Sequence, residues 1–234
     1  MKNKTFNLWT ESYGGHYGPT FYDYFYEQNQ AIANGTQDGC ELHMDTLGII
    51  NGIIDERIQA PYYPEFARYN TYGIQAINET IYNFMKTFYY IPGGCRDYID
   101  ACDASDRSTE EGKETCSRAT DLCRGFVEQP YYYYGGRGVY DIRHPYDDPT
   151  PPDYFVDYLN QADVQNALGV NINYTSTSSS YVGQGFSYTG DFVYRRFLDD
   201  LTDILDNNVR VALIYGDADY ICKFLEQRSP MGAG

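Results

Sequence analysis

A serine near the start of the chain stands in a sequence that could make it a catalytic nucleophile. Ser12 follows the short apolar stretch 5–9 and comes just before the glycine pair Gly14-Gly15. This order predicts a nucleophile elbow, a tight strand–turn–helix connection that lifts the serine oxygen clear of the sheet. The backbone N–H of Tyr13 would then face the oxyanion that forms when the serine attacks. An ordinary strand-to-helix turn is the alternative, because Thr10 stands where the general motif has glycine.

A carboxylate that could serve such a serine stands near the other end of the chain. Asp219 lies in the sequence Gly216-Asp217-Ala218-Asp219, directly after an expected strand at 209–215. In α/β hydrolases the triad acid follows a later strand, and the chain order is Ser, Asp, His. The acid holds the histidine in the correct tautomer and stabilises the imidazolium that forms. The alternative is that both aspartates belong only to a solvated turn.

The stretches between these two segments predict a parallel α/β sheet. Two apolar runs, 47–54 and 209–215, show no alternation, which is typical of strands buried on both faces. We expect Pro19 to open a helix and Asn34-Gly35 to end it. A strand, a helix and another buried strand in this order favour the α/β class. The expected helical faces comprise Phe21, Phe25 and Ile32; Ile77, Ile81, Phe84, Met85 and Phe88; and Val193, Phe197, Leu201, Ile204 and Leu205.

Composition restricts the class of function. The chain has 234 residues, of which 42% are hydrophobic, enough for one large domain that carries an insertion. A formal charge of −16 argues against a nucleic-acid partner, because phosphates are bound by basic surfaces. No apolar stretch reaches the roughly 18 residues that a membrane-spanning helix needs. The composition therefore favours a globular domain that does not bind nucleic acid or span a membrane.

Four N-x-S/T sequons, together with six cysteines, indicate a protein of the secretory pathway. The sequons lie at Asn3, Asn34, Asn78 and Asn173, although each could be an ordinary surface asparagine. No basic–apolar–small signal peptide opens the chain. We therefore expect the complete protein to have residues upstream of this sequence.

Four of the cysteines predict two disulfide bonds. Cys95, Cys102, Cys116 and Cys123 are spaced 7, 14 and 7 residues apart, on two expected helices. Bonds within one helix are excluded, because seven residues rise about 10.5 Å and a disulfide joins Cα atoms less than about 7 Å apart. A crossed pairing would need parallel helices, which the short turn at 103–108 prevents. The nested pairs Cys95–Cys123 and Cys102–Cys116 remain. A Cys₄ metal site is the alternative, but the segment lacks a C-x₂₋₄-C pair.

Several segments resemble the serine carboxypeptidases (peptidase family S10), and look most like their fungal members. The resemblance runs from about residue 5 to 222 in the order of the family. It implies an α/β-hydrolase fold with a partial parallel sheet, in which 55–153 is a disulfide-stapled helical lid inserted in a domain spanning 1–234. The matching segments are Trp9-Thr10-Glu11-Ser12-Tyr13-Gly14-Gly15-His16-Tyr17-Gly18-Pro19, Ile50-Asn51-Gly52-Ile53-Ile54-Asp55, the four-cysteine spacing, Val139-Tyr140-Asp141-Ile142-Arg143, Tyr158-Leu159-Asn160, Val164-Gln165-Asn166-Ala167-Leu168-Gly169-Val170 and Gly216-Asp217-Ala218-Asp219-Tyr220-Ile221-Cys222.

The resemblance implies a serine-type carboxypeptidase, which hydrolyses the C-terminal residue of peptides through an acyl-enzyme. Ser12 would be the nucleophile, Asp219 the triad acid, and Tyr13 a donor to the oxyanion. Glu11 would help to bind the terminal carboxylate of the substrate, and facing carboxyl groups share a proton best under acidic conditions. Cys222 would be an unpaired thiol that lines a substrate subsite. Peptide substrates, a secreted or vacuolar location, and no metal or organic cofactor are also implied.

The chain departs from the family pattern at its histidines. The triad histidine of the family follows the aspartate, whereas His16, His43 and His144 all precede Asp219. We therefore expect a piece of the family domain, truncated at both ends, in which His16 is structural. A catalytically inactive chain that at most binds peptides is the alternative function. A lipase or esterase of the same fold is disfavoured by Glu11 and by the cysteine-stapled insertion.

Overall fold

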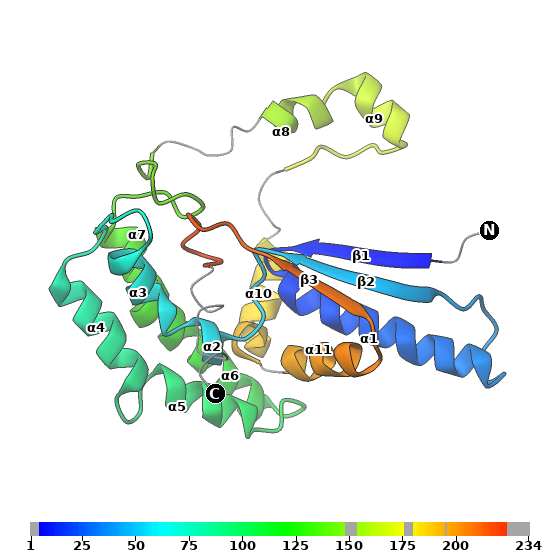
Figure 1. The fold of residues 1–234 in the computed structure, drawn as a ribbon, viewed down its shortest axis with the longest axis horizontal. Helices are drawn as coiled ribbons and strands as arrows, with labels where there is room; N and C mark the ends of the chain where they lie inside the picture. The colour runs from blue at the N-terminus through cyan, green and yellow to red at the C-terminus, as the bar shows by residue number, and fades with distance from the viewer. Residues whose placement is uncertain (1–4, 148–153, 176–179, 195, 224–234) are drawn as a thin grey trace.

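A small parallel sheet lies at the centre of the computed structural model (Figure 1). Its strands are β1 (Thr5–Glu11), β2 (His43–Ile50) and β3 (Arg210–Ile214), hydrogen-bonded in the order β1-β2-β3. Both neighbouring pairs are parallel, and the register sets Trp9 of β1 beside Gly48 of β2. The predicted parallel α/β sheet is thereby confirmed. The structure describes residues 5–147, 154–175, 180–194 and 196–223.

Strand β2 begins and ends four residues earlier than the apolar run at 47–54 predicted. It ends at Ile50, and Asn51 adopts a left-handed conformation with φ 45°, which ends the strand. Ile53 and Ile54 are nevertheless buried in the loop that follows. The prediction was right about burial and wrong about the bounds of the strand, because an apolar run cannot distinguish a buried strand from a buried turn.

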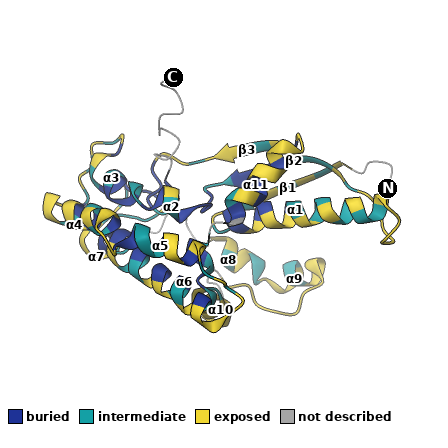
Figure 2. Ribbon diagram, turned by 90° about the horizontal axis from the view of Figure 1, so that it is seen from below, coloured by how far each residue is buried: buried dark blue, intermediate teal, exposed yellow. Residues whose placement is uncertain are grey.

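Two helices cover one face of the sheet, α1 (Gly14–Ala33) and α11 (Arg196–Asp206) (Figure 2). Their apolar sides and the sheet enclose one hydrophobic cluster, formed by Tyr22, Leu47, Ile49, Ile54, Leu201, Ile204 and Val209. The helix at the C-terminal end was predicted at the correct place. Two of the positions expected on its buried face differ: Val193 is buried but precedes the helix, and Leu205 is 53% exposed.

Helix α1 begins five residues earlier than predicted. Its first residue is Gly14, so Pro19 lies inside the helix rather than at its start. A proline lacks the N–H that would reach back to the carbonyl of Gly15, and its cost is lowest near a helix N-terminus. The early start follows from the turn at Ser12, which feeds the chain directly into the helix.

The chain between β2 and β3 carries a group of helices that lies beside the sheet (Figure 1). Its own hydrophobic core is larger than that of the sheet and includes Phe66, Met85, Ile99 and Val127. The elements are α2 (Glu56–Gln59), α3 (Tyr62–Tyr69), α4 (Glu79–Tyr90), α5 (Cys95–Asp103), α6 (Glu110–Cys123), a π-helix (Arg124–Glu128) and α7 (Pro130–Tyr134).

Two disulfides join α5 to α6 in the nested pattern that the sequence predicted. Cys95 bonds to Cys123, with Cα atoms 4.8 Å apart, and Cys102 bonds to Cys116, with Cα atoms 4.6 Å apart. The two helices therefore form an antiparallel hairpin that is closed at both ends. Cys222 is free and buried, as expected, and Cys40 is free and exposed.

Within the described residues, the segment before α11 contains the helices α8 (Tyr154–Leu159), α9 (Ala162–Leu168) and α10 (Ser180–Thr189). Helices α8 and α9 stand away from the sheet (Figure 1), whereas α10 packs against α6. No helix in the described ranges is long and apolar enough to cross a membrane. The sequon asparagines Asn34, Asn78 and Asn173 are exposed, and Asn3 lies outside the described residues.

Candidate active site

Ser12 occupies the turn between β1 and α1 in a left-handed conformation, with φ 58°. This conformation is costly for any residue with a Cβ atom, and it persists only where the surroundings enforce it. Here the N–H of Ser12 donates to the carbonyl of Ile50 over 3.0 Å. Its carbonyl accepts from the N–H groups of Ile53 and Gly15, each over 3.0 Å. The turn exposes the Ser12 side chain, as a nucleophile elbow requires.

The glycine pair after Ser12 is required by close approach. A Cβ atom on Gly15 would lie 2.3 Å from the carbonyl oxygen of Ile53. A Cβ atom on Gly14 would lie 2.6 Å from the Cβ of Thr10. Thr10 in turn donates its hydroxyl to the Gly14 carbonyl over 2.9 Å. The elbow therefore accommodates a threonine where the general motif has glycine, because Gly14 supplies the missing space.

Asp219 is buried in the loop that follows β3, with 4% of its surface exposed. One carboxylate oxygen accepts a hydrogen bond from the Asn51 side chain over 2.5 Å, and the other accepts from the N–H of Cys222 over 3.0 Å. Burial raises the pKa of the Asp219 carboxyl above its ordinary value, although these hydrogen bonds act in the opposite direction. The carboxyl is thus fixed in direction but poorly solvated.

Asn51 connects the serine turn to the aspartate loop. Its N–H donates to the Ile214 carbonyl over 2.7 Å, and its side-chain oxygen accepts from the N–H of Gly216 over 2.9 Å. Because Asn51 directly follows Ile50, which holds the Ser12 N–H, one strand end positions both candidate catalytic residues. The sequence pointed to this Asn-Gly segment but assigned Asn51 no role.

The aspartate loop is also packed against the segment at 137–146. The N–H groups of Tyr220 and Ile221 donate to the Val139 carbonyl over 3.0 and 3.2 Å. The Tyr220 ring stacks on Tyr131 of α7, with ring centroids 3.7 Å apart and planes inclined by 10°. The helical insertion therefore helps to hold Asp219 in place.

Cys222 lies beside both the serine turn and Asp219. Its buried thiol lies close to Ser12 and to Asp219. Burial raises the pKa of this thiol, and the negative charge of Asp219 raises it further, so the sulfur stays protonated. Ser12, Asp219 and Cys222, which the sequence assigned to one site, are therefore neighbours in the structure.

Glu11 and Tyr140 complete the exposed side of this cluster. Glu11 is the last residue of β1 and is exposed beside the serine. Burial raises the pKa of the Tyr140 hydroxyl, and the negative charge of Asp219 raises it further. Tyr140 was not predicted as a site residue, and its only signal was its place in the segment Val139-Tyr140-Asp141-Ile142-Arg143.

The side chain of Tyr13 points away from this cluster toward the helices. Its hydroxyl donates to Asp191 over 2.8 Å, and its ring centroid lies 4.5 Å from that of His16 and 5.6 Å from that of Phe186. Its backbone N–H belongs to the start of α1, where N–H groups have no partner within the helix. The role of this N–H as an oxyanion donor stays a prediction.

The histidines lie at other places. His16 is buried, contacts Asp191 through Nδ1 at 3.4 Å and stacks on Phe197. His144 is partly exposed, 3.8 Å from Asp141, and His43 is exposed at the start of β2. Among the described residues, none of the hydrogen bonds to Asp219 comes from a histidine. The described part of the chain also holds no cluster of three or more His, Cys, Asp or Glu residues that could bind a metal ion.

Comparisons with known proteins show the family to which the chain is similar. The family model for serine carboxypeptidases (Peptidase_S10) matches residues 1–232. The chain is 42% identical over 237 residues to "Carboxypeptidase S1 homolog A" of Arthroderma otae, and the match covers 95% of this chain and 36% of that relative. It is 34% identical to "Carboxypeptidase S1" of Penicillium janthinellum, with 96% of this chain and 51% of the relative covered. The chain therefore spans between about a third and half the length of these relatives.

A solved structure shares the fold. The chain superposes on Kex1(delta)p, a prohormone-processing carboxypeptidase from Saccharomyces cerevisiae, with a TM-score of 0.60 and 19% sequence identity. The match covers 94% of this chain and 46% of that structure. At this identity the likeness concerns the fold, which is the predicted α/β-hydrolase type with a partial parallel sheet.

Proposed function

The chain belongs to the serine carboxypeptidase family, and we propose that it carries the nucleophile and the acid of an enzyme that hydrolyses the C-terminal residue of peptides. The observation that carries this proposal is the meeting of Ser12, in its left-handed turn, with Cys222 and the buried Asp219. In such a reaction the Ser12 hydroxyl attacks the peptide carbonyl, the C-terminal amino acid leaves, and water then releases the acyl group.

Each remaining site residue has a proposed part in this reaction. The N–H of Tyr13 would donate to the oxyanion as negative charge develops on the carbonyl oxygen. The exposed Glu11 would meet the terminal carboxylate of the substrate, and Cys222 would line the pocket beside Ser12. The insertion predicted at 55–153, of which residues 148–153 lie outside the described residues, would form a lid over peptide substrates. We further propose a secreted or vacuolar location, in keeping with the two disulfides and the exposed sequons.

Among the described residues, no histidine lies beside Ser12 to act as its base. An unassisted hydroxyl is a weak nucleophile, and Asp219 can orient a base but is too weak to replace one. His16, His43 and His144 are held elsewhere, so the 234-residue chain by itself should react slowly. An inactive chain that at most binds peptides is the alternative function.

Supplying the base in solution separates the two functions. We expect a fluorophosphonate to label Ser12 slowly in the isolated chain. Added imidazole should raise the labelling rate by about tenfold or more. This increase should be smaller than the ~10²–10⁴-fold that a positioned base contributes. Mass spectrometry of the labelled peptide identifies the residue. Labelling should disappear in Ser12→Ala and lose its response to imidazole in Asp219→Asn, because Asp219 can no longer orient the base.

The matched control is Ser105→Ala, which removes another serine hydroxyl from a different part of the chain. This variant should label like the unchanged protein. Labelling that does not respond to imidazole, or that persists in Ser12→Ala, would contradict the proposed catalytic site. Binding of a blocked dipeptide without any imidazole-dependent labelling would favour the inactive alternative.

A further inference from the structure

Asp191 is a partly buried carboxylate with three partners from distant parts of the chain. It opens the 3₁₀ turn Asp191–Val193 that follows α10, and 17% of its side chain is exposed. One oxygen accepts from the Tyr13 hydroxyl over 2.8 Å and lies 3.4 Å from Nδ1 of His16. The other oxygen lies 3.6 Å from the Arg107 guanidinium. Two of these partners belong to the serine elbow and the third belongs to the helical insertion.

Electrostatics favours the ionised form of this carboxyl. Burial acts to raise the pKa of Asp191, but the hydrogen bonds from His16 and Tyr13 and the charge of Arg107 outweigh burial. The pKa of Asp191 is therefore held below its ordinary value. In return, burial and then the negative charge of Asp191 raise the pKa of the Tyr13 hydroxyl well above its ordinary value. The hydroxyl thus remains a donor to the carboxylate.

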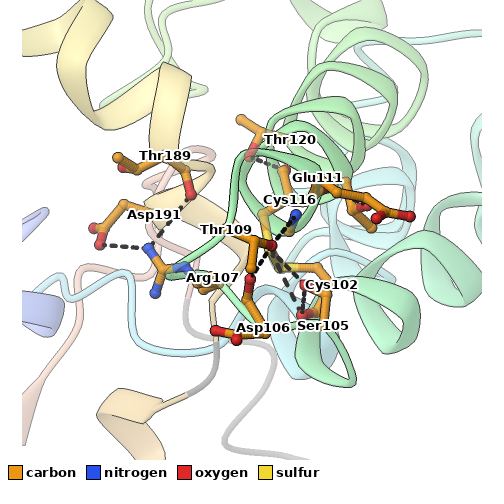
Figure 3. Close-up of a disulfide and its surroundings, with 12 residues drawn as sticks. Cys102, Ser105, Asp106, Arg107, Thr109, Glu111, Cys116, Thr120, Thr189 and Asp191 are labelled. Atoms are coloured by element: carbon orange, nitrogen blue, oxygen red, sulfur yellow. Dashed lines mark hydrogen bonds and ion pairs between the residues drawn. A yellow bond between two sulfur atoms is a disulfide. The ribbon is translucent and has the colours of Figure 1, made fainter.

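Arg107 is presented to Asp191 from a loop that a disulfide closes. It lies between α5 and α6, inside the 14-residue separation that Cys102–Cys116 closes (Figure 3). Figure 3 shows its guanidinium pointing away from the disulfide toward Asp191 and Thr189, whose carbonyl it also reaches at 3.4 Å. The guanidinium further stacks over the Tyr194 ring, 3.6 Å from its centroid. A cation held on several sides is well placed to fix a carboxylate.

The packing around Tyr13 leaves Asp191 as the polar anchor of an otherwise aromatic pocket. The Tyr13 ring lies against His16, Phe186 and Phe192. Aromatic contacts restrict a ring but do not fix its rotation about the Cα–Cβ bond as sharply as a charge-assisted hydrogen bond does. Because Tyr13 directly follows Ser12, any movement of its backbone also moves the serine turn.

We propose that Asp191 is a positioning residue that anchors Tyr13 beside Ser12, and that Arg107 of the disulfide-bonded hairpin holds this carboxylate in place. The helical insertion is thereby connected to the nucleophile elbow by one ion pair. This role deepens the proposed function, since it gives the serine turn its support, but its test does not use the serine reaction. Failure of the carboxypeptidase proposal would therefore leave the test intact.

Nitration by tetranitromethane tests the anchor, because the reagent attacks the phenolate form of tyrosine. In the oxidised 234-residue chain at low micromolar concentration, we expect Tyr13 to be nearly inert beside Tyr181, which is 86% exposed. Asp191→Asn removes the charge that raises the pKa of Tyr13, so its nitration should rise by about tenfold for each unit by which that pKa falls. Its pH profile should move to lower pH, and Asp191→Glu, which keeps the charge, should restore part of the protection.

Two internal controls separate a local change from unfolding. Tyr131 and Tyr220 are fully buried and should stay unmodified in every folded variant. Asp200 is a buried aspartate of α11 that accepts a hydrogen bond from Thr20 of α1. The variant Asp200→Asn should therefore leave Tyr13 protected. An unchanged Tyr13 rate in a folded Asp191→Asn variant would overturn the proposal, as would rapid nitration of Tyr13 in the unchanged chain.

A second variant decides the matter if Asp191→Asn also exposes Tyr131 and Tyr220. Arg107→Gln leaves the carboxylate in place but removes the cation that holds it, so nitration of Tyr13 should rise several-fold. Arg118→Gln is the matched control, because Arg118 lies on the same hairpin over Tyr98 and away from Asp191. A selective rise at Tyr13 in Arg107→Gln alone supports the anchor. Equal rates in the two arginine variants would overturn it.

Discussion

Strain and burial at single residues are concentrated where the two candidate catalytic residues meet. Ser12 and Asn51 both adopt left-handed conformations, and both belong to the hydrogen-bonded connection between β1, β2 and β3. Two carboxylates on either side of this connection have pKa values displaced in opposite directions. Burial raises the pKa of Asp219, whereas the hydrogen bonds and charge around Asp191 lower its pKa. The two residues should therefore affect stability with opposite dependence on pH.

The pH dependence of the free energy of unfolding should show that the pKa values of Asp219 and Asp191 are displaced in opposite directions. Because the pKa of Asp219 is raised in the folded state, the folded chain binds more protons than the unfolded chain between the two pKa values. Its contribution is present below the unfolded pKa, near 3.9, and is lost as pH rises through the folded pKa. We expect urea unfolding to show that the advantage of the unchanged chain over Asp219→Asn is greater at pH 4 than at pH 7.

Asp191→Asn provides the control of opposite sign. The lowered pKa of Asp191 means that its contribution is present above the unfolded pKa and is lost as pH falls through the folded pKa. The unchanged chain should therefore exceed Asp191→Asn more at pH 7 than at acidic pH. If both aspartate variants showed the same trend with pH, the opposite displacement of the two pKa values would be wrong.

At the scale of elements, the sequence predicted what local pattern and cysteine spacing can specify. Helical periodicity located the disulfide-bonded hairpin, and the spacing of its cysteines excluded every pairing but the nested one. The start of α1 was placed at Pro19 rather than Gly14, because proline is a common first helical residue and the tight turn before it leaves no periodic signal. Element ends were thus less predictable than the elements themselves.

Long-range partners could not be predicted from local pattern. Asn51 contacts Asp219 across 168 residues, and Tyr13 contacts Asp191 across 178 residues. No periodicity or spacing relates such pairs, since they meet only after the sheet and the insertion have packed. The resemblance to a family located Ser12 and Asp219, but the residues that hold them in direction became visible only in the structure.

The elbow itself offers a test of close packing. In Gly15→Ala the new methyl group would lie 2.3 Å from the Ile53 carbonyl oxygen, so the strand end or α1 must move. We expect a loss of about 1–3 kcal/mol in the free energy of unfolding, as for other overpacked sites. Urea unfolding, followed by circular dichroism, measures the difference.

The matched control changes a helical glycine that has open space around it. A Cβ atom on Gly183 of α10 would meet no heavy atom within 4 Å. Gly183→Ala should therefore be neutral or stabilise the chain by up to about 1 kcal/mol, because alanine favours the helix. Equal stabilities of the two alanine variants would show that the close approach at Gly15 does not limit the elbow.

At the scale of the whole molecule, the chain has two hydrophobic cores of unequal protection. The insertion encloses its core among helices and two disulfides, whereas the sheet is covered on the side of α1 and α11. On the other side, Trp9 is 52% exposed and Ile214 is 49% exposed. Their positions in the register place both side chains on the same face of the sheet. Parallel sheets are normally covered on both faces, so this surface favours association.

The exposed face should therefore make the 234-residue chain self-associate, and a charge placed there should oppose it. Burial of an isoleucine side chain contributes about 1.5–3 kcal/mol, which corresponds to roughly a tenfold or greater change in an association constant. We expect Ile214→Lys to weaken self-association by at least that factor in sedimentation velocity at micromolar concentrations. The fluorescence of Trp9, the one tryptophan of the chain, should shift to longer wavelength in parallel, because this face of the sheet is then exposed to water.

The matched control is Leu205→Lys, at a position 53% exposed on α11, which should associate like the unchanged chain. A monomeric unchanged chain would contradict the self-association that we expect of the exposed face. An equal effect of the two lysine variants would also contradict it, because a non-specific change in net charge would then explain the result.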